Sequence, residues 1–313
     1  MNPSPNLAVV IVSWNVRGLL TACLRSLLAD LASTGLETEV WVVDNGSTDN
    51  TPQMVAEAFP DVHLIASREN LGFVRGNNCA LNEILGREAP VDYFWLLNPD
   101  TEVQPGATAA LIAALEANPK AGIVGPKLLY ADGSLQHSAF RFPGLVQLLF
   151  EFLPLPARLY DTRLNGRYPR RLYEGAKPFL IDHPLGASML VRAEAVADVG
   201  LMDEDFFMYC EEIDWCWRMR EAGWRALCAP AAHVIHHAGQ SSGQVEATSL
   251  ANLWKSRAIL YARHHVPLKQ RLARLVVRIG MKRRLRNASP ETTTCRETAD
   301  AYQQILQAWE GTG

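Results

Sequence analysis

Short apolar runs that alternate with helical segments constrain the fold of this 313-residue chain more than any other feature of its sequence. The apolar runs in the first 100 residues cover 7–13, 39–43, 62–66 and 93–97. The segments between them show helical spacing, at about 17–32, 50–59 and 73–85. This alternation predicts an α/β fold in which a Rossmann-like, mostly parallel sheet carries helices on both faces. Ligands of such sheets bind beyond the carboxyl ends of the strands.

The second half of the chain is less regular. A helical segment at 106–118 and an apolar run at 123–126 continue the alternation, and residues 130–184 then lose periodicity and carry six prolines. We interpret 130–184 as a long excursion that faces an acceptor or moves, because long irregular loops are usually functional. Regular spacing returns with a run at 185–191, a helix at 193–199, and short strands near Ala226 and Val234.

Composition and length favour one large globular domain followed by an extension. Hydrophobic residues make up 48% of the chain and charged residues 20%. The start of the chain lacks the pattern of a secretory signal, and no apolar stretch approaches the roughly 20 residues that span a bilayer. The six cysteines form no Cys-x-x-Cys pair and sit mostly among apolar neighbours, which is typical of reduced, buried thiols in a cytoplasmic protein.

Positive charge is concentrated near the end of the chain, although the net charge is only −3. Residues 247–290 contain no acidic side chain and eleven Lys or Arg. Apolar residues recur there at helical spacing, at Leu268, Leu272, Leu275, Val276 and Ile279. A basic amphipathic helix at 267–286 is typical of segments that lie on an anionic membrane, so we expect a cytoplasmic protein that is peripheral at the inner face of the cell membrane. A helix packed on the body is the alternative, and the apolar stripe disfavours a nucleic-acid partner.

Three carboxylates lie close together in Glu211-Glu212-Ile213-Asp214, inside an aromatic and apolar stretch from Phe206 to Trp217. Burying an unpaired carboxylate is costly, so the cluster predicts a catalytic wall. The alternative is a surface helix start in which Asp214 pairs with Arg218. On a helix Glu212 and Asp214 are about 200° apart, so they do not both reach one hydroxyl, and Glu211 shares a face with Asp214.

Polar residues follow the apolar runs where ligands are expected. Asp44, Asn70 and Asp100 all fall at predicted strand ends. Asp100 with the neighbouring oxygen of Asn98 suits a hard cation such as Mg²⁺ or Mn²⁺, although a type I turn around Pro99 explains the same residues.

The segment 70–78 combines glycine, arginine and asparagine at a helix start. Gly72 allows a close approach of the backbone to a ligand, and Arg75 and Asn78 suit a diphosphate. The segment is neither the Gly-x-Gly-x-x-Gly fingerprint nor a Walker A loop, which disfavours an NAD-dependent dehydrogenase and a P-loop enzyme.

Three histidines lie in an apolar strand-like segment, at positions 233, 236 and 237. Alternation with period two places His233 and His237 on one face and His236 on the other. Their spacing fits no standard zinc pattern. Two interpretations of His236 remain. It either binds a metal ion together with Asp100, or it is a structural histidine of the core.

Six motifs in order, at residues 10–15, 42–49, 70–78, 96–100, 186–190 and 209–218, resemble the family 2 glycosyltransferases, most of all their bacterial rhamnosyltransferase branch. The resemblance implies a GT-A domain at 1–240, with a nucleotide-binding half at about 1–126 and an acceptor half at about 127–240, followed by a helical, basic extension at 241–313. It also implies an inverting transfer from a nucleoside diphosphate sugar. The donor we expect first is thymidine diphosphate L-rhamnose. The acceptor we expect is lipid-linked or a polysaccharide, as in cell-wall or polysaccharide biosynthesis.

The resemblance also assigns residues on the nucleotide side. Asp44 matches the residue that binds the pyrimidine base, and Ser13 and Asn15 line the same pocket. The nucleotide-side loop matches the segment with Asn70, Gly72, Arg75 and Asn78.

Metal and catalytic residues follow from the same resemblance. Asn98-Pro99-Asp100 occupies the Asp-x-Asp motif, so Asp100 is the expected ligand of Mg²⁺ or Mn²⁺ and His236 completes the metal shell. Glu212 matches the catalytic base, and Glu211, Asp214 and Arg218 support it. Two positions depart from the family pattern: Glu212 stands where many relatives have Asp, and Asn98 replaces an Asp of the stricter motif.

Chemistry supports this assignment, since displacing a diphosphate needs cations on the leaving group and a base on the opposite face. A sugar nucleotidyltransferase is the second enzyme class considered, but residues 13–17 lack the Gly-rich, Arg-containing loop that it needs. A non-catalytic, membrane-associated protein that binds nucleotide sugars is a third interpretation, and carboxylates at both Asp100 and Glu212 argue against it. The sequence leaves the oligomeric state open.

Overall fold

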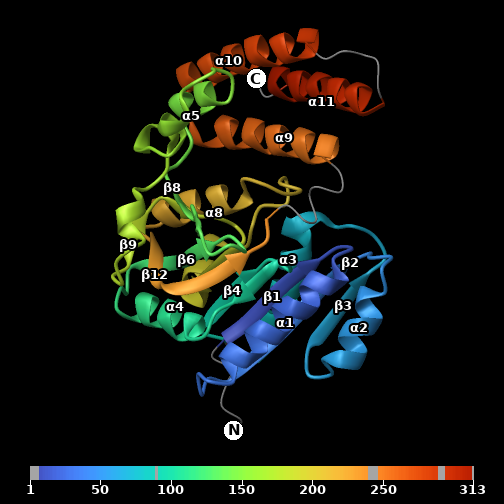
Figure 1. The fold of residues 1–313 in the computed structure, drawn as a ribbon, viewed down its shortest axis with the longest axis vertical. Coiled ribbons are helices and arrows are strands. Elements are labelled where there is room, and N and C mark those ends of the chain that lie inside the picture. Colours follow the sequence, from blue (N-terminus) through green and yellow to red (C-terminus); the bar gives the residue numbers. More distant parts are fainter. Residues whose placement is uncertain (1–6, 89–90, 239–245, 288–292, 312–313) are drawn as a thin grey trace.

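The computed structural model describes residues 7–88, 91–238, 246–287 and 293–311. Its centre is a ten-stranded sheet with the order β3-β2-β1-β4-β11-β6-β12-β5, with β7 beside β6 and β9 beside β12 (Figure 1). The first strands in this order pair in parallel, as the alternation predicts. These are β1 (Leu7–Ser13), β2 (Thr38–Asn45), β3 (His63–Ser67) and β4 (Tyr93–Leu97).

Helices cover both faces of this sheet, which confirms the predicted layers. β1 is buried along its whole length, with Leu7, Val9 and Ile11 in one core and Ala8 and Val10 in another. Successive side chains of a strand point to opposite faces, so one seven-residue run supplies both cores. The first core includes residues of α1 (Arg17–Leu31), α2 (Thr51–Ala58) and α4 (Ala107–Glu116). The second includes residues of α3 (Gly72–Leu85), α7 (Ala193–Val199) and α8 (Glu211–Glu221).

The other half of the sheet is mixed. β11 (Ser188–Arg192) runs antiparallel to both β4 and β6 (Ala121–Leu129). It begins beside Leu97, at the carboxyl edge of β4, because the excursion after β6 ends at that edge and the chain then turns back. The two short strands expected near Ala226 and Val234 form one strand, β12 (Arg225–His236), with a register shift between Ala229 and His233. β5 (Thr101–Val103) closes this edge.

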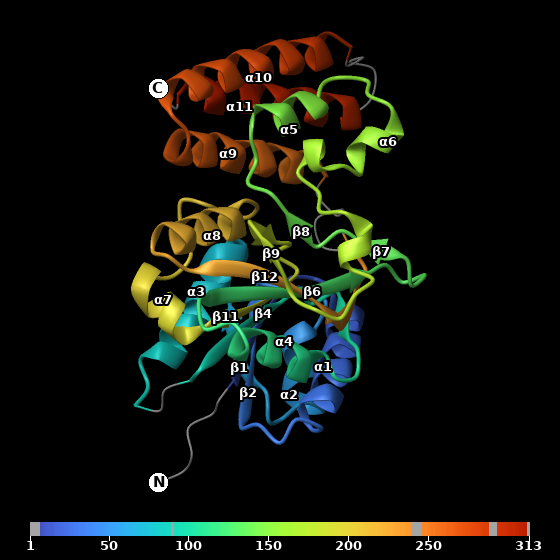
Figure 2. The ribbon, with the colours of Figure 1, turned by 90° about the vertical axis from the view of Figure 1, so that its left-hand side faces the viewer.

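The excursion at 130–184 consists of short pieces, each too short for a periodic pattern to show. They are β7 (Leu135–Gln136), β8 (Ala139–Phe140), α5 (Leu145–Phe150), α6 (Ala157–Tyr160), the 3₁₀ helices Arg163–Asn165 and Arg170–Leu172, β9 (Phe179–Ile181) and β10 (His183–Pro184). α5 leaves the sheet and packs on the C-terminal helices (Figure 2).

The C-terminal helices are α9 (Glu246–His264), α10 (Pro267–Asn287) and α11 (Thr293–Glu310). They form a separate core around Trp254, Val277, Ile305 and Trp309 at the end of the molecule away from the N-terminus (Figure 1). α9 lies between α10 and the sheet domain and contacts α8. The expected domain boundary at 240–241 falls outside the described residues. Among the helices described here, none is long and apolar enough to cross a membrane.

The described cysteines are free thiols. Cys23, Cys210, Cys216 and Cys228 are buried, as expected, whereas Cys79 is exposed. Burial raises the pKa of Cys23 and of Cys228 to about 12, so these thiols stay protonated.

Candidate active site

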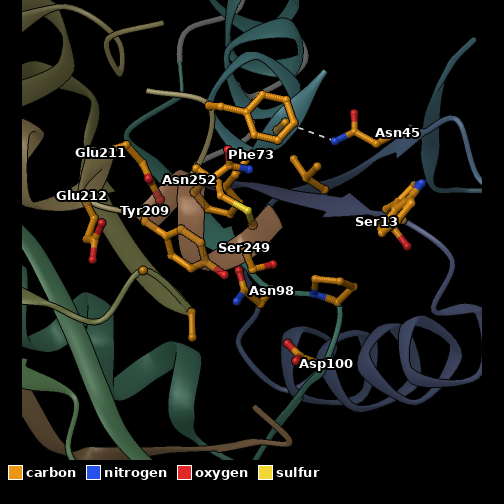
Figure 3. A pocket seen from close by; sticks show the side chains of 18 of the residues that line it. Ser13, Asn45, Phe73, Asn98, Asp100, Tyr209, Glu211, Glu212, Ser249 and Asn252 are labelled. Atoms are coloured by element: carbon orange, nitrogen blue, oxygen red, sulfur yellow. Dashed lines mark hydrogen bonds between the residues drawn. The ribbon is translucent and has the colours of Figure 1, made fainter. Parts of the chain in front are cut away.

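A cavity of about 460 Å³ opens at the carboxyl edge of β1 and β4, where the strand pattern predicts a ligand site. Ser13 lies on one side of it, and Glu211 and Glu212 lie on the other (Figure 3). Asn98 and Asp100 lie between these two sides. One cavity therefore joins residues that are up to about 240 positions apart in the sequence, from Val12 to Asn252.

Buried polar atoms without partners mark the strand-end side of the cavity. Ser13 is paired with Asp44 across β1 and β2. Ser13 Oγ, Asp44 Oδ1 and Asn45 Oδ1 are buried, and none has a hydrogen-bond partner among the described residues. The other Asp44 oxygen accepts a hydrogen bond from the Ser47 backbone at 3.0 Å. A buried polar atom left unpaired costs free energy, so these positions suit a ligand that carries matching donors and acceptors.

Ser13 and Asn45 line the cavity, whereas Asp44 and Asn15 do not. Asn15 Oδ1 accepts a hydrogen bond from the Thr48 backbone at 2.8 Å, and the Asn15 backbone donates to Ser47 Oγ at 2.9 Å. Asn15 therefore holds the 47–48 turn against the end of β1, and it supports the site without lining the cavity.

The start of α3 holds the loop that precedes α8. Gly72 has φ +79°, and a Cβ built there would lie 2.5 Å from the Phe207 carbonyl oxygen. Only glycine fits this close approach. The Phe73 backbone donates to the same carbonyl at 2.9 Å, and Asn70 Oδ1 accepts from the Gly72 backbone at 2.9 Å. Asn70 and Gly72 also line the cavity, as expected, but the close approach is to protein backbone.

Arg75 and Asn78 do not line the cavity, in contrast to their predicted contact with a diphosphate. The Arg75 side chain is 61% exposed and pairs with Glu204 at 3.4 Å. Asn78 is buried and donates to the Met202 carbonyl at 2.8 Å. The helix spacing turns both side chains toward the loop at 202–204. Their contact with a diphosphate therefore stays a prediction.

Asp100 and His236 come together although 136 positions separate them. β12 pairs with β5, which places His236 Nε2 3.4 Å from Asp100 Oδ1 at the cavity wall. Both side chains are buried. His236 Nδ1 lies 3.0 Å from Gln136 Oε1, and this amide oxygen can only accept, so Nδ1 carries a proton and Nε2 is the ring nitrogen directed at Asp100.

This pair fits a divalent cation. A carboxylate oxygen and an imidazole nitrogen suit Mn²⁺, and Mg²⁺ also binds through few protein ligands, with waters and substrate phosphates completing its shell. Within the described ranges no group of three or more His, Cys, Asp or Glu could hold a metal alone, so phosphate oxygens would have to supply further ligands. Asn98 lines the cavity beside Asp100.

The other two histidines lie elsewhere. His233 is exposed, and His237 Nε2 is 2.7 Å from Glu102 Oε1. Strand alternation thus separates His236 from His233, as predicted, whereas His237 follows the end of β12.

The carboxylate side of the cavity is built at the start of α8. Tyr209 and Cys210 precede the helix in left-handed conformations, with φ 69° and 66°. Such backbone is strained for residues other than glycine and is common at functional sites. Glu211 and Glu212 follow, are both buried, and both line the cavity. The alternative of a surface helix start is therefore wrong for these two residues.

Burial changes the protonation of both glutamates. It raises the pKa of Glu212 to about 7. It also raises the pKa of Glu211 well above its ordinary value, and the neighbouring charge of Glu212 adds to this rise. One oxygen of each carboxyl group has no partner among the described residues. Near neutral pH the pair therefore holds at least one proton and can exchange it with a ligand in the cavity.

Asp214 does not line the cavity and has a structural role. Its carboxylate accepts hydrogen bonds from Arg218 Nε and from His264 Nε2, both at 2.8 Å. The expected pairing of Asp214 with Arg218 is confirmed. Burial acts to raise the pKa of Asp214, but these hydrogen bonds outweigh it and lower the pKa below its ordinary value. His264 is the last residue of α9, so this contact ties the C-terminal helices to α8.

α9 also reaches the site directly, because Thr248, Ser249 and Asn252 line the cavity. The sequence places these residues in the extension, outside the predicted domain. Their spacing on one face of a helix is visible in the sequence, but nothing there indicates what that face meets. Gln136 was missed for a similar reason, since it comes from the irregular excursion.

Comparison with known proteins identifies the family. Residues 8–198 match Glycosyl transferase family 2. The chain is 34% identical over 245 residues to N-acetylglucosaminyl-diphospho-decaprenol L-rhamnosyltransferase of Mycobacterium tuberculosis, which covers 75% of this chain and 79% of that protein. It is 24% identical over 241 residues to dTDP-rhamnosyl transferase RfbF of Shigella flexneri, which covers 77% and 72%.

Solved structures agree with the fold. The mannosyltransferase PcManGT of Pyrobaculum calidifontis, in complex with GDP-Man and Mn²⁺, superimposes with a TM-score of 0.56 at 16% identity. The match covers 98% of this chain and 86% of that protein. This likeness supports a GT-A fold, and the sequence matches go further: the chain belongs to glycosyl transferase family 2 and is a glycosyltransferase.

Proposed function

We propose that this glycosyltransferase moves L-rhamnose from a thymidine diphosphate donor to a hydroxyl group of a sugar carried on a lipid diphosphate, with inversion at the anomeric carbon. The donor follows the names of two relatives, both of which specify rhamnosyl transfer, and the lipid-linked acceptor follows the decaprenol-linked substrate in one of them. A single cavity that joins unpaired strand-end polar atoms to a buried carboxylate pair carries the proposal.

The nucleotide base would lie at the ends of β1 and β2. Thymine presents an N–H group between two carbonyl oxygens. Asp44 Oδ1 would accept from that N–H, and Ser13 Oγ would donate to a carbonyl or accept from the ligand. These contacts would satisfy two buried oxygen atoms that otherwise lack partners.

The diphosphate would lie beside Asp100 and His236, which would hold Mg²⁺ or Mn²⁺ together with phosphate oxygens. The cation, when bound, neutralises charge on the leaving diphosphate. Gln136 fixes the His236 ring, so that Nε2 faces Asp100. Asn98 lies at the same wall and could donate its amide to a phosphate or to the sugar.

Glu212 would act as the general base. Its carboxylate accepts the proton of the acceptor hydroxyl while that oxygen attacks the anomeric carbon and the bond to the diphosphate breaks. Attack from the face opposite the leaving group inverts the configuration. A base with a pKa near 7 is well matched to this work near neutral pH, because it is partly ionised and still basic.

The direct test uses purified protein, Mg²⁺ or Mn²⁺, and a short-chain N-acetylglucosaminyl-diphospho-prenol acceptor. We expect rhamnose transfer and a product whose anomeric configuration, read by NMR, is opposite to that of the donor. Thymidine diphosphate rhamnose at 100 times its Kd should add about 2.7 kcal/mol to the free energy of unfolding. Stabilisation by uridine or guanosine diphosphate sugars alone would contradict the donor assignment, and a retained configuration would contradict direct displacement.

A further inference from the structure

The outer surface of α10 carries a row of large apolar side chains that nothing in the described structure covers. Their exposed fractions are 69% for Leu268, 43% for Leu272, 42% for Leu275 and 61% for Ile279. At about 100° per residue, these four side chains fall within a stripe about 60° wide. We call this set the α10 stripe. An ordinary surface helix would present polar residues there.

The stripe is not the face by which α10 joins the protein. The buried residues of α10 are Ala273, Val277, Gly280 and Met281, and they lie on the opposite side of the helix. Of these, Ala273, Val277 and Met281 pack in the core that also contains Trp254, Ile305 and Trp309. α10 therefore has two apolar faces. Because the face with Ala273 and Val277 packs on the protein, the α10 stripe points toward solvent.

Close contacts with the excursion hold α10 in this orientation. A Cβ at Gly280 would lie only 2.1 Å from the Phe152 ring, so the ring packs directly on the helix backbone. Arg284 donates to the Glu151 carbonyl on the same side. Rotating α10 to bury the stripe would break both contacts, so the stripe is a fixed feature of the surface.

Positive charge flanks the stripe on both sides. Arg271, Arg278 and Lys282 lie along one margin by helical spacing, and Arg283 lies along the other. α10 contains no acidic residue. The first margin is also hollowed: a cavity of about 280 Å³ between α10 and α11 is lined by Arg271, Arg274 and Arg278, with Leu275, Leu306, Trp309 and Glu310 completing it.

We propose that the α10 stripe docks on a lipid bilayer that carries anionic headgroups. The leucines and isoleucine would enter the boundary between headgroups and acyl chains, and the flanking arginines and lysine would meet lipid phosphates. The cavity between α10 and α11 has three arginines against one carboxylate, Glu310, and its other walls are apolar, which suits a phosphate with the start of its chain. An apolar centre with cationic margins binds favourably to an anionic bilayer surface, because the centre enters the apolar layer and the margins meet the headgroup charges.

The charges disfavour other occupants. A second copy of the chain would bring two rows of arginine and lysine face to face, and like charges at such distances repel. Nucleic acid would meet the cations but would leave the stripe exposed to water or pressed against phosphates. An anionic bilayer can bury the α10 stripe and pair with the cations on its margins at the same time.

This inference rests on the proposed function in one respect, because a lipid-linked acceptor would be presented at the same bilayer. α9 connects the two regions: it packs in the core shared with α10, and its Thr248, Ser249 and Asn252 line the active-site cavity. Figures 1 and 2 show α9 between α10 and the sheet domain. Docking through α10 would therefore hold the α9 wall of the cavity on the membrane side.

Sedimentation of the full-length protein with large unilamellar vesicles tests the proposal. We expect binding to vesicles of phosphatidylcholine with phosphatidylglycerol, and at least about tenfold weaker binding to phosphatidylcholine alone. A variant with Leu268→Ser, Leu272→Ser, Leu275→Ser and Ile279→Ser should lose at least about tenfold in binding to the anionic vesicles. Arg271→Gln with Arg278→Gln should weaken binding and reduce its dependence on salt.

The matched control replaces leucines that are equally exposed but lie elsewhere, in Leu85→Ser, Leu164→Ser and Leu180→Ser. This control should bind anionic vesicles like the original protein. Equal vesicle binding by the stripe variant would overturn the proposal. So would light scattering that shows a dimer dissociated by the stripe variant, or binding to duplex DNA that exceeds binding to anionic vesicles.

Two further measurements separate this proposal from the enzymatic one. Thermal stabilisation by thymidine diphosphate rhamnose should be unchanged in the stripe variant, which also shows that the variant folds. The KM for a long-chain lipid acceptor in vesicles should rise at least about tenfold, and turnover of a water-soluble acceptor should stay within about twofold. Loss of donor binding in both the stripe variant and its control would point to misfolding, and the single changes Leu268→Ser and Ile279→Ser would then replace the combined variant.

Discussion

The two ends of the active-site cavity are built by different means. At one end, adjacent parallel strands place Ser13, which lines the cavity, and its strand partner Asp44, which does not; the strand register continues through both residues. At the other, Glu211 and Glu212 follow two residues in left-handed conformations and a loop held against Gly72. Regular hydrogen bonding fixes the first end, and local strain with close packing fixes the second.

Both ends contain buried polar atoms without partners, but their chemistry differs. Asp44 keeps one oxygen bonded to the backbone of Ser47 and leaves the other for a ligand, which suits a binding site. The two glutamates are neighbours in a buried setting that raises the pKa of each, which suits a site where a proton moves. Rigid strands are adequate for recognition, whereas proton transfer needs a tuned carboxylate.

The largest effect should come from Glu212→Gln. Glutamine has nearly the same shape but cannot accept the acceptor proton, so we expect sugar transfer to fall about 10² to 10⁴-fold. Donor binding, measured by thermal stabilisation with thymidine diphosphate rhamnose, should change less than about threefold. Glu211→Gln is the matched control and should retain much more activity. Full activity in Glu212→Gln would show that another group is the base.

The pH profile refines the same point. Only the ionised form of Glu212 can act as a base, so kcat/KM should fall about tenfold for each unit of pH below about 7. A profile that stays flat down to pH 5 would remove the carboxylate pair from the proton transfer.

The next effect should come from Asp44→Asn, at the binding end. The substitution places an amide where the proposed thymine N–H needs an acceptor, so the KM for the donor should rise about 10 to 100-fold with a smaller change in kcat. Arg75→Gln is the informative comparison, because the sequence predicted a diphosphate contact that the structure does not place in the cavity. Its effect on KM should be below about threefold. An equal rise for Arg75→Gln would restore the original prediction.

The contrast between the two ends also explains what could be predicted from sequence. Asp44 and Asp100 follow apolar runs, and because parallel strands end at one edge, the pattern alone places them at the same edge of the sheet. Ser13 was assigned by the family resemblance. Strand alternation likewise separates His236 from His233.

Other parts of the site depend on tertiary contacts that leave no local pattern. Gln136 comes from a two-residue strand inside the excursion, and Asn252 from a helix of the extension. Glu211 is the clearest case: helix geometry groups it with Asp214, yet it lines the cavity while Asp214 pairs with His264. The tertiary contacts around the first turn of α8 determine that Glu211 lines the cavity and that Asp214 pairs with His264.

The smallest expected effect concerns stability, and it compares the same two acids. Folding raises the pKa of Glu211, so the folded state holds a proton that the unfolded chain has lost above about pH 4.5. The free energy of unfolding therefore falls as pH rises above that value. Glu211→Gln removes this dependence, and its Tm should exceed that of the original protein by about 2 to 4 °C at pH 8 and by less at pH 5.

Asp214→Asn should behave in the opposite way, because hydrogen bonds from His264 and Arg218 lower the pKa of Asp214 in the folded state. Its contribution is present above the unfolded pKa, so the substitution should lower Tm at pH 8, and the loss should shrink as pH falls toward the folded pKa. Differential scanning calorimetry from pH 4 to pH 8 measures both variants. Parallel Tm curves for the original protein and Glu211→Gln would mean that Glu211 is ionised in the folded state. The two neighbouring carboxylates would then repel each other across the cavity wall, and a cation or a donor from the ligand would be needed at this end as well.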